Sequence, residues 1–249
     1  MRESYSQQVL DGLLAGVGAR QGWDFSGMKV LCQPVPWDYR DVAVRYLRSS
    51  NVVLDVGTGA GERLSELAPS FGRGLGVDAD PEMVRLAREG TAAGNLSFRV
   101  CSERLESVPE TFDMILDRHA QFDLRAVAAH LRPGGYFITQ QVGERNMACV
   151  KAALGQPPGL PPIRRQAFAD SGLRLLAFME YDVEYVVLDI ESLVFWLNAL
   201  DLAHADVDGQ SALASATILN RVLAGNVDER GFVTNEHRYL AIAQSVRDG

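Results

Sequence analysis

The sequence predicts an α/β protein whose parallel strands are joined by helical crossovers. Strand-like apolar runs alternate with helical patterns from residue 51 to residue 142, as expected of such a sheet. A glycine-rich turn follows the first run, and two long extended segments come near the end of the chain. With 249 residues, 47% of them hydrophobic, the chain can bury one large core and carry covering elements as well.

Local signals mark where several elements begin. In PWDYRDVAVRYL, Asp38 is the expected cap of a helix that leads into the first core strand, with Asp41 three residues later as a carboxylate version of the capping box. Asp80 followed by Pro81 predicts the start of another helix, because proline fits the first helical position. The segment RPGGY predicts a type II turn directly before a strand.

The two ends of the chain add elements to this core. Residues 173–188 and 231–246 are predicted as the sixth and seventh strands, antiparallel to each other, with a helical insertion at 190–228 between them. Residues 1–40 are expected to form an N-terminal helical lid, and residues 41–249 the main domain.

Composition restricts the partners and the compartment. The formal net charge is -8 and there is no basic run, so the charged surface of a nucleic-acid binder is not expected. No apolar stretch approaches the roughly 20 residues that span a bilayer, and Glu3 and Asp11 fall where a signal peptide would lie. The three cysteines are far apart and odd in number, which fits a reducing compartment. We therefore expect a cytoplasmic protein without a nucleic-acid or membrane partner.

The turn in VLDVGTGAGE, residues 53–62, excludes two common phosphate-binding loops. A P-loop needs GK[ST] after its glycines, whereas the only lysines here are Lys29 and Lys151. A dinucleotide-binding turn has the spacing G-x-G-x-x-G, but this turn reads G-x-G-x-G. Asp55, just before the glycines, would repel a pyrophosphate but suits a ligand with an ammonium group. A nucleoside that carries an amino acid meets this requirement, because its carboxylate can accept backbone N–H groups near the next helix.

A second carboxylate makes nucleoside binding more specific. Asp78 ends the strand in GLGVDAD, 21 residues after Gly57, where it can accept hydrogen bonds from both hydroxyls of a ribose. Glycine turns alone are common. A strand, DVGTGAG, a second strand ending in aspartate, a helix, a strand and RPGG in this order form a much stronger signal.

These motifs resemble those of the S-adenosylmethionine-dependent methyltransferases with the Rossmann-like fold, most specifically across residues 51–142. The resemblance implies a doubly wound, seven-stranded sheet, mostly parallel with an antiparallel last strand, and S-adenosylmethionine as cofactor. It implies that Asp78 holds the ribose and that Ala79 and Met83 flank the adenine. The residues implied to line the methionine part are Asp55, Gly57, Thr58, Gly59 and Gly61.

The adenine end departs from the family pattern. Many members place an acidic residue after the third strand to meet the adenine amino group, but FRVCSERLE has Cys101 and Ser102 at that position. Ser102 is the expected adenine contact, with Glu103 as a competing candidate.

The segment FDMILDRHAQFD is expected to face the methyl acceptor. Its strand should end at Asp117, which places Asp117 toward the cofactor and Arg118 and His119 at the carboxyl edge of the sheet. His119, whose ordinary pKa is about 6.5, is the candidate base that takes a proton from a hydroxyl or another acidic nucleophile. The alternative is structural: Asp117 pairs with Arg118, and His119 caps the following helix or closes the pocket. Methyltransferases that act on adenine or glutamine amino groups resemble one another in an NPPY-type tetrapeptide here, so DRHA disfavours such substrates.

Other residues are weaker candidates for the substrate side. Gln140 and Gln141 end the strand in FITQQVG, where an amide either orients a substrate or bonds to a neighbouring loop. Tyr39 lies in an aromatic segment just ahead of the core and is a further candidate substrate contact. The four histidines include no i, i+4 pair and have no cysteine partners, so no metal site is predicted.

A roofed, partly aromatic pocket suits a small organic acceptor better than a polymer. Together with the resemblance, this predicts a small-molecule methyltransferase, for example one of specialised metabolite biosynthesis. Two alternatives stay open: a methyltransferase for RNA or protein, and a cofactor-binding protein of this fold that transfers no methyl group. The sequence leaves the acceptor atom and the oligomeric state undetermined.

Overall fold

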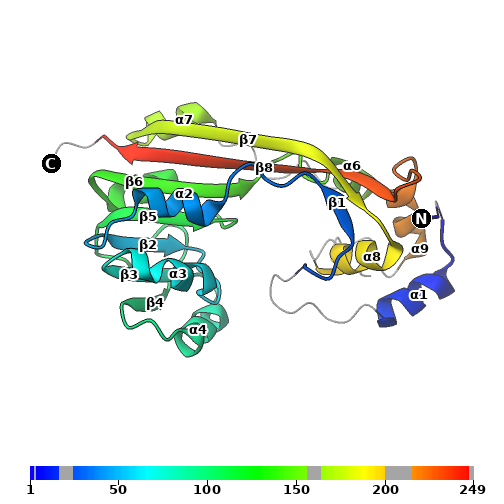
Figure 1. The fold of residues 1–249 in the computed structure, drawn as a ribbon, viewed down its shortest axis with the longest axis horizontal. Coiled ribbons are helices and arrows are strands. Elements are labelled where there is room, and N and C mark those ends of the chain that lie inside the picture. Colours follow the sequence, from blue (N-terminus) through cyan, green and yellow to red (C-terminus); the bar gives the residue numbers. More distant parts are fainter. Residues whose placement is uncertain (3, 17–24, 156–163, 200–214, 247–249) are drawn as a thin grey trace. The chain divides into compact units, whose positions relative to one another are not determined.

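The structure is a computed structural model that describes residues 1–2, 4–16, 25–155, 164–199 and 215–246. Its helices and strands are labelled in Figure 1. The chain divides into two compact units. The core unit consists of Val35–Val142, Pro162–Glu180 and Arg238–Gly249, and the second unit of Met1–Pro34, Gly143–Pro161 and Tyr181–His237.

The core unit contains the predicted mostly parallel sheet. Four neighbouring strand pairs are parallel, namely β4 with β3, β3 with β2, β2 with β5 and β5 with β6, whereas β8 runs antiparallel to β6. The full order is β1-β7-β8-β6-β5-β2-β3-β4. The core unit contains β2 (Val52–Val56), β3 (Arg73–Asp78), β4 (Leu96–Val100), β5 (Phe112–Arg118), β6 (Leu131–Val142) and parts of two long strands, β7 (Leu173–Val187) and β8 (Phe232–Ser245), whose other parts belong to the second unit.

The last two strands lie within a residue of their predicted bounds. The N–H of Val246 donates to the carbonyl oxygen of Gly172 at 3.3 Å, so the end of β8 lies beside the start of β7 (Figure 1). The prediction that they are antiparallel to each other is confirmed. Within the described residues the sheet has eight strands rather than seven, because the three-residue β1 (Val30–Cys32) also pairs with β7.

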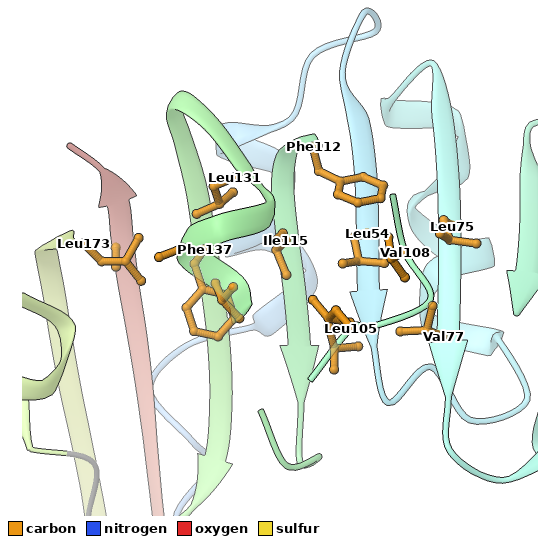
Figure 2. Close-up of a cluster of buried hydrophobic side chains, with 14 of the residues drawn as sticks. Leu54, Leu75, Val77, Leu105, Val108, Phe112, Ile115, Leu131, Phe137 and Leu173 are labelled. Carbon is orange, nitrogen blue, oxygen red and sulfur yellow. The ribbon is translucent and has the colours of Figure 1, made fainter. Parts of the chain in front are cut away.

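Helices cover both faces of the parallel strands. Side chains alternate along each strand, so Val53 packs with helices α2, α3 and α4, while Leu54 packs with α5 and α7. Figure 2 shows the second of these clusters, in which Leu54, Ile115 and Phe137 come from neighbouring strands. The helices are α2 (Tyr39–Tyr46), α3 (Glu62–Leu67), α4 (Pro81–Gly90), α5 (Leu124–His130) and α7 (Arg165–Asp170), with the short 3-10 helix η1 (Ala68–Ser70) after α3.

Both predicted helix caps are confirmed. Asp38 accepts the N–H of Asp41 at the start of α2, and Asp80 accepts the N–H of Glu82 at the start of α4, each at 2.8 Å. Such a bond satisfies one of the N–H groups that the first helical turn leaves without a partner.

The predicted turn in RPGGY has the expected conformation but a different place. Gly134 has φ of 71°, which a type II turn requires at its third residue. However, β6 already begins at Leu131, because the sheet register jumps between the pairs Phe112–Leu131 and Met114–Tyr136. The turn is therefore a bulge inside the strand.

The second unit is built around its own apolar core. The N-terminal helix packs with the helices after β6 and β7, and Leu10, Leu193 and Leu219 are all buried in one cluster. The helices are α1 (Gln7–Gly16), α6 (Ala148–Ala153), α8 (Ile190–Ala199) and α9 (Ala216–Leu223). The predicted insertion at 190–228 thus contains α8 and α9, although residues 200–214 lie outside the described part. Its role as a lid, with residues 1–40, stays a prediction.

Among the described residues, no helix combines the length and the apolar character that crossing a bilayer requires.

The cap of α4 gives a stability prediction. Asp80→Ala removes the acceptor for the Glu82 N–H and should lower the free energy of unfolding by about 1 kcal/mol. Asp80→Asn keeps a capping oxygen and should unfold like the wild type. Urea unfolding followed by circular dichroism compares the three proteins, and identical midpoints would show that the cap does not limit stability.

Candidate functional site

The turn after β2 adopts a left-handed backbone conformation at three positions. Gly57, Gly59 and Gly61 have φ of 66°, 58° and 81°, which glycine adopts without a steric cost. The N–H of Thr58 donates to the carbonyl oxygen of Val77 in β3 at 2.9 Å, and Gly61 is the N-cap of α3. The turn therefore lies across the carboxyl ends of β2 and β3.

The three glycines serve different purposes. A Cβ added at Gly57 would lie 2.0 Å from the Cβ of Ala120, and one at Gly61 would lie 2.9 Å from the ring of Phe98. At Gly59 a Cβ would meet no described atom within 4 Å. Gly57 and Gly61 thus permit close packing of the chain, whereas Gly59 leaves space for a ligand against the backbone.

Asp78 is fixed beside this space. Its Oδ2 accepts the N–H of Gly59 at 2.9 Å, and its Oδ1 accepts the N–H of Asp80 at 3.0 Å. The side chain is half-buried, and each oxygen keeps a lone pair for a hydroxyl group. The carboxylate therefore fits the predicted ribose contact. The N–H of Cys101 donates to the backbone oxygen of Asp78 at 2.9 Å, which brings Ser102 to the same edge.

The predicted adenine contacts also lie at this edge. Ser102 donates its hydroxyl proton to Glu106 at 2.8 Å and accepts the N–H of Arg104 at 3.2 Å. Its second lone pair can still accept the adenine amino group. Ala79 is exposed and Met83 half-buried, so both offer apolar surface to a base.

Two buried carboxyl groups lie on the neighbouring strands β2 and β5. Asp55 is 7% exposed and Asp117 is 0% exposed. Burial, with a smaller contribution from Asp78, raises the pKa of Asp55 to about 7. Burial also raises the pKa of Asp117 well above its ordinary value, and the charge of Asp55 adds to this rise. In the described part of the chain, no three His, Cys, Asp or Glu side chains form a group that could hold a metal ion.

Asp117 keeps one oxygen unsatisfied. Its Oδ1 accepts hydrogen bonds from the hydroxyl of Thr139 at 3.0 Å and from the amide of Gln141, whereas its Oδ2 has no hydrogen-bond partner among the described residues. A buried polar oxygen without a partner is costly. A cation at this edge would relieve that cost and would lower the pKa values of Asp55 and Asp117. The pair therefore fits the ammonium group expected of the ligand.

Two parts of the structural alternative predicted for DRHA, the Asp117–Arg118 ion pair and the helix cap by His119, are wrong, whereas the part in which His119 closes the pocket stays a prediction. Asp117 bonds to Thr139 and Gln141 and forms no ion pair with Arg118. The cap of α5 is Asp123, which accepts two backbone N–H groups at 2.8 and 3.0 Å, so His119 does not cap this helix.

His119 is held by a chain of hydrogen bonds. Its backbone has φ of 63°, and its N–H donates to the carbonyl oxygen of Gln140 at 2.8 Å. The indole N–H of Trp37 donates to the side-chain oxygen of Gln140 at 2.8 Å, and an indole can only donate. The amide nitrogen of Gln140 must therefore face Nε2 of His119, which lies 2.9 Å away and accepts its hydrogen bond.

This arrangement selects the neutral tautomer of His119 with its proton on Nδ1. Although much of the residue is exposed to solvent, burial on the protein side of the ring, followed by the charges of Arg118 and Arg238, lowers the pKa of His119 below its ordinary value. Since the pKa is lowered and the Nε2 lone pair is already used by Gln140, the ring offers a substrate its Nδ1–H donor rather than a base. A base role for His119 stays a prediction, and it requires a substrate that displaces Gln140.

The predicted substrate residues Tyr39, Arg118 and Gln140 meet at one cavity. It encloses about 200 Å³, and its walls include Trp37 and Arg63. Tyr39 donates its hydroxyl to the backbone oxygen of Asp117 at 3.2 Å, which fixes its ring as a wall.

The sequence did not identify Trp37 and Thr139 as members of the hydrogen-bonding networks, whereas Gln141 was a candidate for a bond to a neighbouring loop and donates to the carbonyl oxygen of Ala120 at 3.0 Å. Thr139 lies opposite Asp117 in the register of β5 and β6, so knowing this register would have pointed to the pair. Trp37 gave no comparable signal, because its bond to Gln140 depends on where α2 begins over the sheet.

Comparison with known sequences gives matches over part of the chain. Residues 53–135 match a protein family described as "Methyltransferase domain". Ribosomal protein L11 methyltransferase of Geobacter metallireducens is 35% identical over 102 residues, which cover 39% of this chain and 34% of that protein. The protein of the same name from Pelobacter propionicus is 43% identical over 67 residues, which cover 26% of this chain and 22% of that protein. The chain therefore spans at most about a third of the length of these curated relatives.

Solved structures share the fold at low sequence identity. A functionally unknown protein from Deinococcus radiodurans has a TM-score of 0.62 and 17% identity, with coverage of 96% of this chain and 98% of that chain. A candidate methyltransferase of Bacillus halodurans has a TM-score of 0.59 and 14% identity, with coverage of 84% and 99%. Coclaurine N-methyltransferase, bound to N-methylheliamine and S-adenosylhomocysteine, has a TM-score of 0.54 and 12% identity, with coverage of 83% and 71%.

Two glycine variants separate ligand binding from packing. Both Gly57→Ala and Gly59→Ala place alanine at a positive φ, which costs about 1 to 3 kcal/mol. Gly57→Ala also collides with Ala120 and should be the less stable variant. Gly59→Ala should stay folded but bind S-adenosylhomocysteine poorly, because its methyl group enters the open space. Calorimetry and thermal unfolding measure the two effects, and normal binding by Gly59→Ala would exclude a ligand at this position.

The pKa of His119 can be measured by an NMR titration of its ring protons, with His119→Ala for assignment. We expect a value far below 6.5 in the wild type. In Trp37→Phe the amide of Gln140 is free to turn its oxygen toward the ring, so the pKa should rise. Equal pKa values of His119 in the wild type and in Trp37→Phe would contradict the hydrogen-bond chain.

The lowered pKa of His119 makes the stability of the fold depend on pH. The pKa of the His119 ring is about 6.5 in the unfolded state and lower in the folded state, so the unfolded state binds more protons at pH values between the two. This contribution to stability is complete above about pH 6.5 and is lost as the pH falls through the lower, folded-state value. Unfolding of wild type and His119→Ala across this range should show the smaller loss in the variant.

Proposed function

Since residues 53–135 form a methyltransferase domain of the Rossmann-like, S-adenosylmethionine-dependent family, we propose that this chain transfers the methyl group of S-adenosylmethionine to a small organic molecule. The partly open cavity beside β5 and β6 supports this proposal, because its volume is only about 200 Å³. Ligand pockets usually measure roughly 300 to 1,000 Å³. An acceptor the size of a single ring fits such a space.

The residues divide the work between cofactor and acceptor. When bound, S-adenosylmethionine would supply an electrophilic methyl group. The lone pair of the acceptor would form the new bond to the methyl carbon, and the sulfur would keep both electrons of the broken S–C bond. Asp78 would accept the ribose hydroxyls, and Asp55 and Asp117 would face the ammonium group. Tyr39 and Gln140 would orient the acceptor, and such alignment can supply much of the rate.

A protein acceptor is the main alternative. Both curated relatives are named ribosomal protein L11 methyltransferase, but their matches extend over no more than 102 residues. The net charge of -8 is compatible with a basic protein as partner. The acceptor must therefore be tested directly.

Formation of S-adenosylhomocysteine provides the test. One set of reactions contains small acids, amines and phenols, and another contains ribosomal protein L11. Turnover with a small molecule alone is the expected result. Turnover with the protein alone would replace the proposal, and tight cofactor binding without turnover in either set would favour the alternative without methyl transfer.

Asp78 gives the sharpest prediction for the cofactor. Asp78→Ala should raise the Kd for S-adenosylhomocysteine roughly 10- to 100-fold, because it removes the ribose hydrogen bonds and releases the N–H of Gly59. Asp80→Ala is the matched control, since that carboxylate caps α4, and it should bind like the wild type. Calorimetry measures both. An unchanged Kd for Asp78→Ala would place the nucleoside elsewhere.

A further inference from the structure

The cavity described above contains an uneven set of charges. Arg63 donates two hydrogen bonds to Glu66, at 2.9 and 3.1 Å. Arg40 forms an ion pair with Asp41 at 3.6 Å, and Asp38 accepts the N–H of Asp41 as the cap of α2. These charges at the cavity already have partners within the protein.

Arg118 is the charged residue at the cavity that lacks such a partner. It forms no hydrogen bond or ion pair with any residue that the structure describes. The side chain is half-buried at the end of β5, opposite Gln140 in the sheet register. Burial first, then the charges of Arg63 and Arg238, lower the pKa of this guanidinium, and the charge of Glu66 offsets part of this decrease. A half-buried cation that no anion contacts is unfavourable, and a bound anion would relieve this cost.

The aromatic walls limit what that anion can be. The hydroxyl of Tyr39 is bonded to the backbone oxygen of Asp117, and the indole N–H of Trp37 is bonded to Gln140. The hydroxyl of Tyr39 and the indole N–H of Trp37 thus already donate hydrogen bonds within the protein. What they offer a ligand is apolar ring surface next to the guanidinium.

We infer that the methyl acceptor carries a carboxylate, and that Arg118 binds this group beside the rings of Trp37 and Tyr39. The inference rests on the proposed function and adds the class of acceptor, a small carboxylic acid with an apolar body. A guanidinium binds a carboxylate through two parallel N–H···O bonds. This geometry would fix the orientation of the acceptor as well as its affinity.

The amino-acid end of S-adenosylmethionine is a second source of a carboxylate. None of residues 55–61 lines the cavity, whereas the sequence places the carboxylate of the cofactor at the N–H groups of that turn. We therefore assign Arg118 to the acceptor, and the test includes the other source.

Calorimetry with benzoate and phenylacetate tests the inference, with benzamide and phenylacetamide as their uncharged counterparts. The wild type should bind each acid at least about 10-fold more tightly than its amide. Arg118→Gln should weaken acid binding on the order of 10- to 100-fold without affecting the amides, and Arg118→Lys should recover part of the loss. Acids and amides that bind the wild type equally would overturn the inference.

Arg73→Gln is the matched control. It makes the same charge change at the first residue of β3, at the opposite edge of the sheet, and should bind the acids like the wild type. An equal loss in Arg73→Gln and Arg118→Gln would show a general charge effect and overturn the inference. Thermal unfolding verifies that each variant is folded.

S-adenosylhomocysteine and 5′-methylthioadenosine separate the two carboxylate sources, because only the first has an amino-acid end. If Arg118→Gln weakens binding of S-adenosylhomocysteine alone, Arg118 holds the cofactor and the inference is overturned. Unchanged binding of both nucleosides supports it. A wild type that binds neither nucleoside refutes the proposed function instead, and the acid and amide titrations without nucleoside still decide the role of Arg118.

Discussion

The contact between the turn after β2 and the loop after β5 is the constraint on which the site depends. In the sheet, β3 and β4 follow one another on one side of β2, and β5 and β6 lie on its other side. Where the strand order reverses in this way, the loops after the two neighbouring strands run in opposite directions and leave a crevice at the carboxyl ends of the strands. Gly57 lets the two loops touch, since a Cβ there would overlap Ala120. The bond from Gly59 to Asp78 ties the same turn to β3.

The electrostatics of this edge are unbalanced in two opposite ways. Asp55 and Asp117 are buried carboxyl groups with raised pKa values, and Arg118 is a half-buried cation that forms no hydrogen bond or ion pair with an anion among the described residues. The charge of Arg118 offsets only part of the rise in the pKa of Asp55, and Thr139 and Gln141 hold one oxygen of Asp117. The protein therefore keeps unfavourable charges that ligands with ammonium and carboxylate groups would compensate.

What the sequence predicted well depends on local signals. Asp38 and Asp80 cap their helices as expected, because a capping bond involves only residues of the first helical turn. The glycine spacing identified a turn with positive φ angles, which glycine adopts without a steric cost. The bulge at Gly134 and the bonds among Asp117, Thr139 and Gln141 depend on the register between strands. Register is a property of the assembled sheet, and no single segment of the sequence specifies it.

The hydrogen-bond chain to His119 also restricts the chemistry of the acceptor. Because Trp37 can only donate, the orientation of Gln140 is set, and Nε2 of His119 is occupied as an acceptor. An alcohol must lose its proton during methyl transfer, and no side chain in this chain of hydrogen bonds is ready to take it. A neutral amine or an already ionised group attacks with a free lone pair. The proposed site thus favours such nucleophiles, whose reaction needs alignment with the methyl group more than it needs a base.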